Sequence, residues 1–273
     1  MSGSITVVVT RPGAAGRALA DELNRGGQPA LWLPAFEFGR APDEARVRVV
    51  LSSLLDFDLA IFVSPQAVRA TAALLGQPWP VGTAIAAVGA GTRAAVLESV
   101  PGADGARLLP AREEDLRGSG SEALWPLLQA MQPKPRRVLL LRAQSGREWL
   151  AERLQAAGST VTPLAVYTRL AFTPSADQLG RLVAAAPAGL ASVVSSSDAV
   201  DALAQMLGER PDVLRALRAG PALASHPRIA ERLQAVGFER IRLCTPEPSA
   251  IIASLREGGG KGPGTPAPGV SRP

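Results

Sequence analysis

The chain has 273 residues, 47% of them hydrophobic and only 4% aromatic, with a formal net charge of +5 at pH 7. This length accommodates two domains of ordinary size. No apolar run approaches the roughly 18 residues of a membrane-spanning helix. The opening segment "MSGSITVVVTRPG" lacks the basic region and cleavage site of a signal peptide. We therefore expect a cytoplasmic protein that does not insert into a membrane.

Several classes of site are excluded by the scarcity of reactive side chains. Cys244 is the single cysteine and His226 the single histidine, which excludes an internal disulfide and a Cys/His zinc site. No P-loop motif is present, and "VGAGTRA" lacks the third glycine of a dinucleotide-binding motif. All but two of the 29 basic residues are arginines, dispersed along the chain without interleaved aromatics. This pattern favours a small anionic ligand over nucleic acid.

Short apolar runs alternate with helix-like segments along the chain. The predicted strands are Ile5–Thr10, Ala30–Leu33, Leu59–Val63, Thr83–Val88, Arg136–Leu141, a run near Val161, Ser192–Val194, Ala222–Ala224 and Arg240–Leu243. Amphipathic helices of about ten residues are predicted between them, one of them from about Ser145 to Ala157. Unbroken apolar strands with intervening helices are typical of parallel sheets covered on both faces. The Pro- and Gly-rich segment 102–117 predicts a surface loop, and residues 256–273 predict a disordered tail.

Three pairs of segments indicate an internal repeat. Arg11, Leu19, Ala20, Leu23 and Gly27 match Arg142, Leu150, Ala151, Leu154 and Gly158 at an offset of 131. Two further pairs match at offsets of 132 and 137, namely "SPQAV" with "SSDAV" and "AVGAGTRAAV" with "ASHPRIAERL". The order is kept while the offset grows, as short loop insertions would cause. We expect a duplicated α/β unit, although helices rich in Ala and Leu also resemble one another by chance.

Each repeated segment contains a turn where a predicted strand ends and a helix begins. In parallel sheets, ligands bind at the carboxyl ends of strands, where helix N-termini present N–H groups. The turn residues that we predict to contact an anionic ligand are Arg11, Ser64, Gly89, Thr92, Arg142, Ser145, Gly146, Ser195 and Ser196. Helix N-capping alone explains a serine or threonine at any one turn. The recurrence of such turns in both halves favours ligand binding.

Tyr167 is the single tyrosine of the chain and follows the strand predicted near Val161. Phe36 occupies the corresponding place in the first repeat. Both segments leave one α/β unit and begin the next, which makes them candidate crossovers between domains. A tyrosine at such a place either packs with its hydroxyl hydrogen-bonded at an edge or supplies a proton to a ligand.

Together, these motifs resemble the uroporphyrinogen-III synthase family from about Ile5 to Leu255. The resemblance is carried by "VVVTRPG", "SPQAV" from Ser64, "VGAGT" from Val88, "SEAL" from Ser121, the block from Arg142 to Tyr167 and Ser195-Ser196. It implies two flavodoxin-like α/β domains with parallel sheets, joined by a two-stranded linker. Residues 1–34 and 170–255 would form domain 1, residues 42–162 domain 2, and residues 35–41 and 163–169 the linker strands.

The resemblance also implies a function. Family members cyclise hydroxymethylbilane to uroporphyrinogen III, a lyase reaction of tetrapyrrole and heme biosynthesis that removes water and inverts ring D. No cofactor or metal is implied. The substrate's carboxylates would bind helix N-termini and arginines in a cleft between the two copies of the turn. Tyr167 would be the acid that protonates the leaving hydroxyl. We expect a monomer that transiently contacts the enzyme supplying hydroxymethylbilane.

One turn departs from the family pattern. It reads "SHPRIAERL", so that Ile229 stands where the first repeat has Thr92 and an expected hydroxyl is missing. Arg228 is predicted to bind a substrate carboxylate instead, and His226 to cap the following helix rather than line the cleft. The alternative function is a two-domain binding or sensor protein for an anionic metabolite, which should tolerate loss of the Tyr167 hydroxyl.

Overall fold

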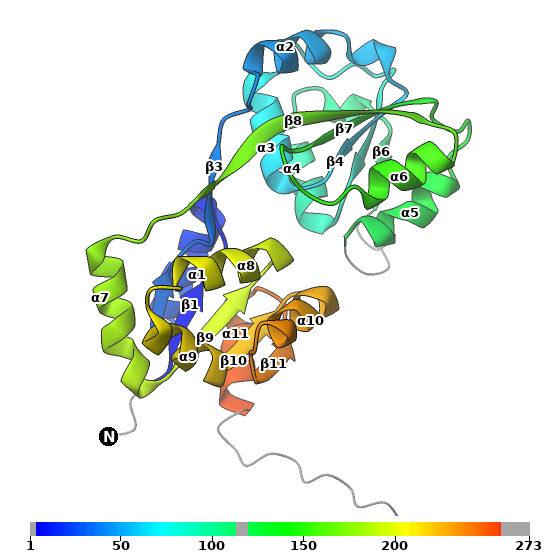
Figure 1. Ribbon diagram of the computed structural model, residues 1–273. Helices are drawn as coiled ribbons and strands as arrows, with labels where there is room; N and C mark the ends of the chain where they lie inside the picture. The colour runs from blue at the N-terminus through cyan, green and yellow to red at the C-terminus, as the bar shows by residue number, and fades with distance from the viewer. Residues whose placement is uncertain (1–3, 113–119, 258–273) are drawn as a thin grey trace, which may run out of the picture. The chain divides into compact units, whose positions relative to one another are not determined.

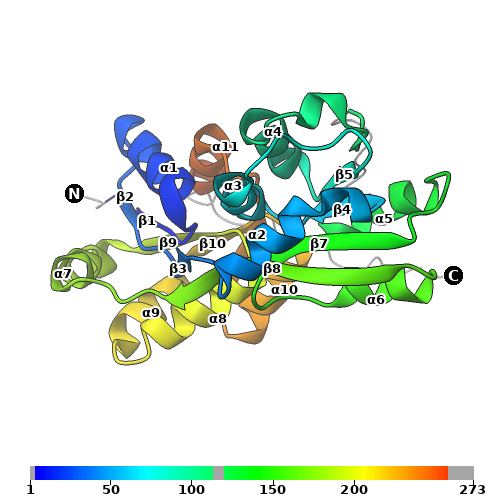
Figure 2. The ribbon, with the colours of Figure 1, turned by 90° about the horizontal axis from the view of Figure 1, so that it is seen from above.

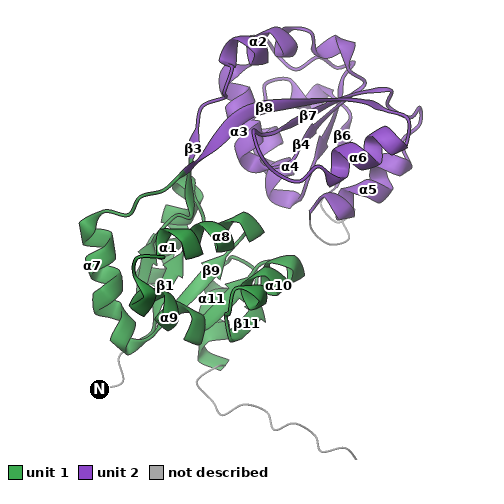
Figure 3. Cartoon of the chain, in the orientation of Figure 1, with its two compact units in different colours: residues 1–37, 171–273 green, residues 38–170 purple. Residues whose placement is uncertain are grey.

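The computed structural model describes residues 4–112 and 120–257. The chain forms two compact units, in which unit 1 joins Met1–Glu37 to Ala171–Pro273 and unit 2 is Phe38–Leu170 (Figure 3). Beyond Glu257, the tail predicted from the sequence lies outside the described residues. None of the described helices is long and apolar enough to cross a membrane.

Strands and helices alternate through both units (Figure 1). Short 3₁₀ turns aside, the described elements are β1 (Thr6–Val9), α1 (Gly13–Arg25), β2 (Ala30–Trp32), β3 (Phe36–Gly39), α2 (Glu44–Ser52), β4 (Leu59–Phe62), α3 (Pro65–Leu74), β5 (Ala84–Ala87), α4 (Ala90–Ser99), β6 (Leu108–Leu109), α5 (Ser121–Gln129), β7 (Arg137–Ala143), α6 (Trp149–Ala156), β8 (Thr160–Ala171), α7 (Ala176–Ala185), β9 (Leu190–Val194), α8 (Ser197–Met206), α9 (Pro211–Ala219), β10 (Pro221–Ala224), α10 (Pro227–Ala235), β11 (Arg240–Leu243) and α11 (Pro248–Glu257).

Each unit is built on one sheet. The strand order is β11-β10-β9-β1-β2 in unit 1 and β3-β8-β7-β4-β5-β6 in the other sheet. The registered strand pairs run parallel in both sheets, as when Val8 pairs with Leu31 on one side and Ser192 on the other. The order β2-β1-β9-β10-β11 is that of the flavodoxin-like doubly wound fold. The predicted α/β class with parallel sheets is confirmed.

The two sheets share one topology, which gives the sequence repeat a structural meaning. When β7 is aligned with β1, as the match of Arg142 with Arg11 requires, β8 corresponds to β2 and β4, β5 and β6 correspond to β9, β10 and β11. The spatial order is then the same in both sheets. In unit 2, however, the strand–helix–strand segment from β7 to β8 follows the other strands along the chain instead of preceding them.

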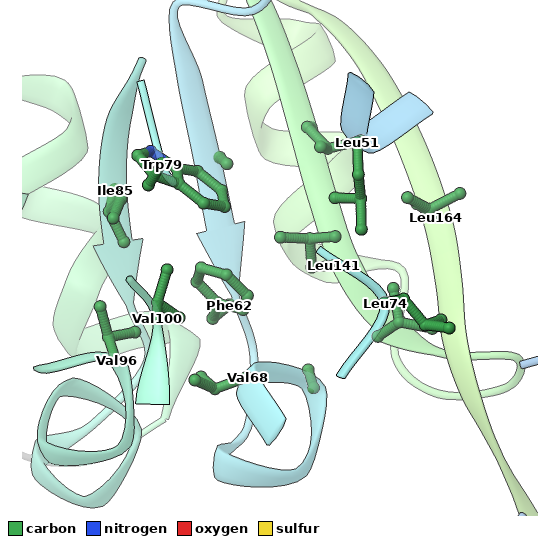
Figure 4. Packing of buried hydrophobic residues seen from close by; sticks show 14 of the residues in the cluster. Leu51, Phe62, Val68, Leu74, Trp79, Ile85, Val96, Val100, Leu141 and Leu164 are labelled. Atoms are coloured by element: carbon green, nitrogen blue, oxygen red, sulfur yellow. The ribbon is translucent and has the colours of Figure 1, made fainter. Parts of the chain in front are cut away.

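Unit 2 buries both faces of its sheet. Helices α2, α3 and α4 pack on one face, where Phe62, Leu141 and Leu164 lie against Leu51 and Val96 (Figure 4). Helices α5 and α6 cover the opposite face, whose buried strand residues include Leu59, Ile61, Val138 and Leu140. Burial on both sides explains why these strands are continuous apolar runs rather than alternating ones.

Unit 1 is covered in the same way. Helices α1 and α11 pack on one face, against Val7, Val9 and Leu223. On the strands, residues whose side chains alternate with these, such as Val8 and Ala222, are also fully buried, and α9 and α10 contact strands β9 and β10 there. The helices α8 and α10 begin just after β9 and β10 end, and the candidate site of this unit lies at these strand ends.

One prediction of local structure is corrected and one strand proves longer than its predicted core. The segment 102–117, predicted as a loop, contributes the edge strand β6 next to β5, and its residues 113–117 lie outside the described ones. With two residues, β6 is too short to produce a recognisable period. The strand predicted near Val161 extends from Thr160 to Ala171, and its residues from Thr160 to Tyr167 lie beside β7 (Figure 2).

Two buried threonines of unit 2 provide a matched test of the packing. Thr83 Oγ1 donates to the carbonyl of Leu54 at 2.7 Å, whereas Thr71 Oγ1 has no hydrogen-bond partner among the described residues. Both residues are fully buried. Replacement by isosteric valine removes a satisfied hydroxyl in one case and an unsatisfied one in the other.

We expect Thr83→Val to lower the free energy of unfolding of unit 2 by about 1–2 kcal/mol, because it leaves the Leu54 carbonyl unpaired. We expect Thr71→Val to raise the same quantity by about 1 kcal/mol, because an unpaired polar group leaves the core. Urea denaturation followed by circular dichroism measures both. Equal losses of stability in the two variants would contradict the assigned hydrogen bonds.

Candidate functional site

In unit 2, the carboxyl ends of three strands lie at one edge of the sheet, next to the middle of a fourth strand. Because β4, β5 and β7 are parallel neighbours, their carboxyl ends lie together. Ser64 follows β4, Gly89 follows β5, and the loop of residues 144–148 follows β7. Tyr167 of β8 pairs with Ala143, the last residue of β7. The structure thus places the predicted residues of this unit at a common edge.

Ser64 and Tyr167 are in direct contact there. The Ser64 Oγ lies 3.2 Å from the Tyr167 hydroxyl, and either oxygen can donate. The same Oγ accepts from the Ala67 N–H at 3.1 Å and so caps α3. One serine therefore connects the only phenol of the chain to the N-terminus of a helix. The same serine therefore both caps α3 and contacts the candidate acid.

A bulge in β8 aims the Tyr167 side chain. Arg142 pairs with Ala165, but the next residue of β7, Ala143, pairs with Tyr167, so Val166 is an extra residue. In a regular strand Val166 and Tyr167 would point to opposite faces. Both instead lie in the core under α2–α4. The bulge therefore turns the phenol toward α3, as bulges near functional sites often do.

The Tyr167 ring is held on its other side by Phe38 of β3. The two rings meet edge to face, with centroids 5.5 Å apart and planes at 87°. The Tyr167 residue is only 2% exposed. Its position is therefore determined by packing along the ring and by Ser64 at the hydroxyl.

The turn after β5 uses its side chains for helix α4 itself. Gly89 is the N-cap residue and has φ +87°, a conformation that favours glycine. The Thr92 hydroxyl donates to the Val88 carbonyl at 2.7 Å, and Thr92 is 2% exposed. This hydroxyl is therefore already bonded within the turn.

The loop after β7 contains a buried arginine. Arg142 is 6% exposed, and its Nη1 donates to Glu148 Oε1 at 2.6 Å. Ser145 and Gly146 are exposed, and Gly146 has φ +148°. The helix predicted from about Ser145 begins only at Trp149. The prediction was wrong because the glycine conformation and the ion pair favour a loop over residues 144–148.

Unit 1 presents the corresponding edge, where β1, β9 and β10 end. Ser196 caps α8 by accepting from the Ala199 N–H at 3.2 Å, as Ser64 caps α3. Ser195 precedes it and is half-buried. Arg11 follows β1, and its carbonyl accepts from Trp32 Nε1 at 2.9 Å. A Cβ at Gly16 would collide with that carbonyl, which requires glycine at this close approach.

The third turn of unit 1 contains His226 and Arg228. The Nδ1 of His226 accepts from the Arg228 backbone N–H at 3.1 Å, and His226 is the N-cap residue of α10. The predicted capping role of His226 is confirmed. Arg228 lies in the first turn of α10 and is half-buried.

The departure at Ile229 has a structural explanation. Ile229 is 5% exposed and its counterpart Thr92 is 2% exposed, so this helix position faces the interior in both units. Because the Thr92 hydroxyl bonds to its own turn, its replacement by isoleucine removes no exposed ligand contact.

The comparisons with known proteins agree with one another. A family model described as uroporphyrinogen-III synthase HemD matches residues 17–253, most of the chain. The chain belongs to the uroporphyrinogen-III synthase family. The match includes most of the turns described above, in both units.

Two curated relatives of this family cover part of the chain. A uroporphyrinogen-III synthase of Salmonella typhimurium is 35% identical over 170 residues, 61% of this chain and 66% of that protein. One of Escherichia coli is 31% identical over 171 residues, 62% of this chain and 66% of that protein. Each match thus spans about two thirds of the relative's length.

Two solved structures share the fold. A mutant uroporphyrinogen III synthase of Thermus thermophilus is 22% identical with a TM-score of 0.58, covering 93% of this chain and 98% of that chain. A synthetase of Helicobacter pylori is 17% identical with a TM-score of 0.56, covering 93% and 99%. At these identities, the likeness establishes the fold alone.

Within the described residues, no cluster of three or more His, Cys, Asp or Glu side chains is arranged to hold a metal ion. The sequence did not reveal the contact of Ser64 with Tyr167, the bulge or the partner of Arg142. Each depends on residues far apart in the chain or on a loop that replaces a helical turn.

The serine caps of the two units provide a matched pair of variants. We expect Ser196→Ala to lower the free energy of unfolding by about 1 kcal/mol, the cost of losing a cap. Ser64→Ala should cost about 1–3 kcal/mol more, because it also leaves the buried Tyr167 hydroxyl without its partner.

In a Tyr167→Phe background, that additional cost of Ser64→Ala should disappear. Chemical denaturation of the single and double variants measures the coupling. A cost of Ser64→Ala that does not change when the phenol is removed would show that the hydroxyl contact contributes nothing.

Proposed function

We propose that this protein is a cofactor-independent lyase that cyclises hydroxymethylbilane to uroporphyrinogen III, with loss of water and inversion of ring D. The observation that carries the proposal is the family match over residues 17–253. It is supported by the chain's single phenol, Tyr167, which lies beside the N-terminus of α3 at the carboxyl edge of a parallel sheet.

We infer that helix N-termini bind the substrate's carboxylates. In unit 2 these are the first turns of α3 and α4, capped by Ser64 and Gly89. In unit 1 they are the turns that carry Arg11, Ser195-Ser196 and Arg228. Unpaired N–H groups and the helix dipole favour anions at such ends, and arginines add charged hydrogen bonds. This role is assigned to the backbone of the Gly89 turn rather than to the Thr92 hydroxyl.

We infer that Tyr167 is the acid. Its O–H gives a proton to the leaving hydroxyl, which departs as water and leaves a cationic azafulvene on the substrate. The Ser64 hydroxyl can then donate to the phenolate oxygen, since the two oxygens are already 3.2 Å apart. When ring D has attacked and the ring closes, the proton released from carbon returns to the phenolate. Atoms and charge balance over the cycle, and one molecule of water is lost.

Proton transfer needs the leaving hydroxyl within hydrogen-bond reach of the phenol. Because the ring of Tyr167 is enclosed by Phe38 and the core, the approach runs along the Ser64 turn. The substrate closes unaided to the type I isomer, so the protein's task is also to hold a conformation that leads to type III.

We also propose that residues 35–41 and 163–169 act as linker strands. The boundary between the two units falls within β3 after Glu37 and close to the end of β8 after Leu170. The Thr168 hydroxyl donates to the Arg40 carbonyl at 3.0 Å, which ties the two strands together. A monomeric state, a cytoplasmic location and a transient contact with the preceding enzyme stay predictions from the sequence.

A binding or sensor protein for an anionic metabolite is not favoured, because the family model and the relatives named above are described as synthases. Freshly generated hydroxymethylbilane, incubated with the protein and then oxidised, distinguishes the two functions. We expect mostly type III porphyrin by chromatography. Type I porphyrin alone, as in a protein-free control, would contradict the proposed enzyme.

We expect Tyr167→Phe to lower kcat by about 10²-fold or more while the product stays mainly type III, since general acid catalysis contributes that much. Ser64→Ala should lower kcat by a smaller factor, and Ser196→Ala, the equivalent cap without a phenol, should lower it least. Steady-state rates on hydroxymethylbilane measure all three. Unchanged kcat in Tyr167→Phe would remove this residue from the chemistry.

A further inference from the structure

The ion pair at the end of β7 joins a buried cation to an exposed anion. The Arg142 side chain is 7% exposed, whereas that of Glu148 is 57% exposed. Their contact of 2.6 Å is a charge-assisted hydrogen bond. The guanidinium cannot leave its place without moving the strand, but the carboxylate can turn toward solvent.

Glu148 leaves most of the arginine's donors unused. A guanidinium carries five N–H groups in a planar fork that matches both oxygens of a carboxylate. Within the described residues, the one partner of this fork is Oε1 of Glu148, through Nη1. Among the described residues, no nitrogen of Arg142 is both buried and without a partner, so the unused donors touch solvent and can meet a ligand. The geometry is therefore that of a carboxylate site which its occupant only partly satisfies.

The loop is shaped to leave the other arm of the fork uncovered. A Cβ at Gly146 would come within 3.4 Å of Arg142 Nη2, and the φ of +148° disfavours any other residue. Gly146 therefore keeps a side chain away from Nη2. The loop of residues 144–148 replaces the first helical turns that the sequence predicts, and it is this loop that carries Glu148 to the arginine.

We propose that Glu148 occupies a carboxylate subsite at Arg142 which a carboxylate of the substrate takes over on binding. This deepens the proposed function and rests on it, since the substrate there is a polycarboxylate. Exchange of one carboxylate for another keeps the buried guanidinium paired throughout. Glu148 thus protects Arg142 in the free protein and lowers the affinity of the subsite for weakly bound carboxylates.

Glu148→Gln tests this proposal with little change in shape. The neutral amide competes less well for the guanidinium, so the subsite should bind its carboxylate ligand more tightly. Glu122→Gln is the matched control, because Glu122 pairs with Arg147 of the same loop at 2.8 Å and is also exposed. It makes the same charge change close by without touching Arg142.

Affinity is measured with uroporphyrinogen III under anaerobic conditions, by quenching of tryptophan fluorescence, together with KM and kcat for hydroxymethylbilane. We expect Glu148→Gln to bind at least about fivefold more tightly and to lower KM, since a charged competitor is lost. Glu122→Gln should change the affinity by less than about twofold. In an Arg142→Met background, Glu148→Gln should have no effect on affinity.

Affinity unchanged or weakened by Glu148→Gln, or a gain equalled by Glu122→Gln, would overturn the proposal and leave a structural ion pair. Glu148→Asp shortens the side chain and must also tighten the binding of uroporphyrinogen III. This variant replaces Glu148→Gln in the test if the glutamine variant does not fold. The isomer assay on the wild-type protein separates this outcome from failure of the proposed function: type III product without any Glu148 effect overturns only the subsite.

Discussion

Parallel pairing of the strands is the constraint from which the candidate site follows. It gathers the carboxyl ends of the parallel strands, and the N-termini of helices that follow them, at one edge of each sheet. Ser64 and Gly89 in unit 2, and Ser196 and His226 in unit 1, are N-cap residues at those edges. The proposed binding of carboxylates therefore relies on backbone N–H groups and needs few titratable side chains.

The proposed chemistry depends on one contact between distant parts of the chain. Ser64 and Tyr167 are 103 residues apart in the chain and 3.2 Å apart in space. The bulge in β8 and the edge-to-face packing on Phe38 both serve to hold the phenol there. A buried tyrosine fixed by packing and by one hydroxyl is pre-organised, so the proposed proton transfer needs little reorganisation.

Sequence reasoning predicted what local patterns encode. Apolar runs marked β1, β4 and β10 because strands buried on both faces leave a continuous signal. The turns followed from glycine and serine at strand ends, and the capping role preferred for His226 is confirmed. The two-residue strand β6 gave no such signal, so the loop predicted over 102–117 missed it.

What could not be predicted depends on contacts across the fold. In the sequence, Thr92 and Arg142 are both polar residues in turns and nothing distinguishes their roles. In the structure, the Thr92 hydroxyl bonds to the backbone of its own turn. Arg142 is instead a buried cation paired with Glu148. The bulge that aims Tyr167 depends on the register between β7 and β8. Family resemblance made Tyr167 the candidate acid, while the structure shows which groups hold it.

The most direct test of the account is to record amide chemical shifts of the labelled protein as uroporphyrinogen III is added anaerobically. We predict that the largest shifts fall on the first turns of α3, α4, α8 and α10 and on the loop of residues 144–148, because the ligand's carboxylates bind those N–H groups. Shifts gathered instead at the opposite, amino ends of the strands would contradict it.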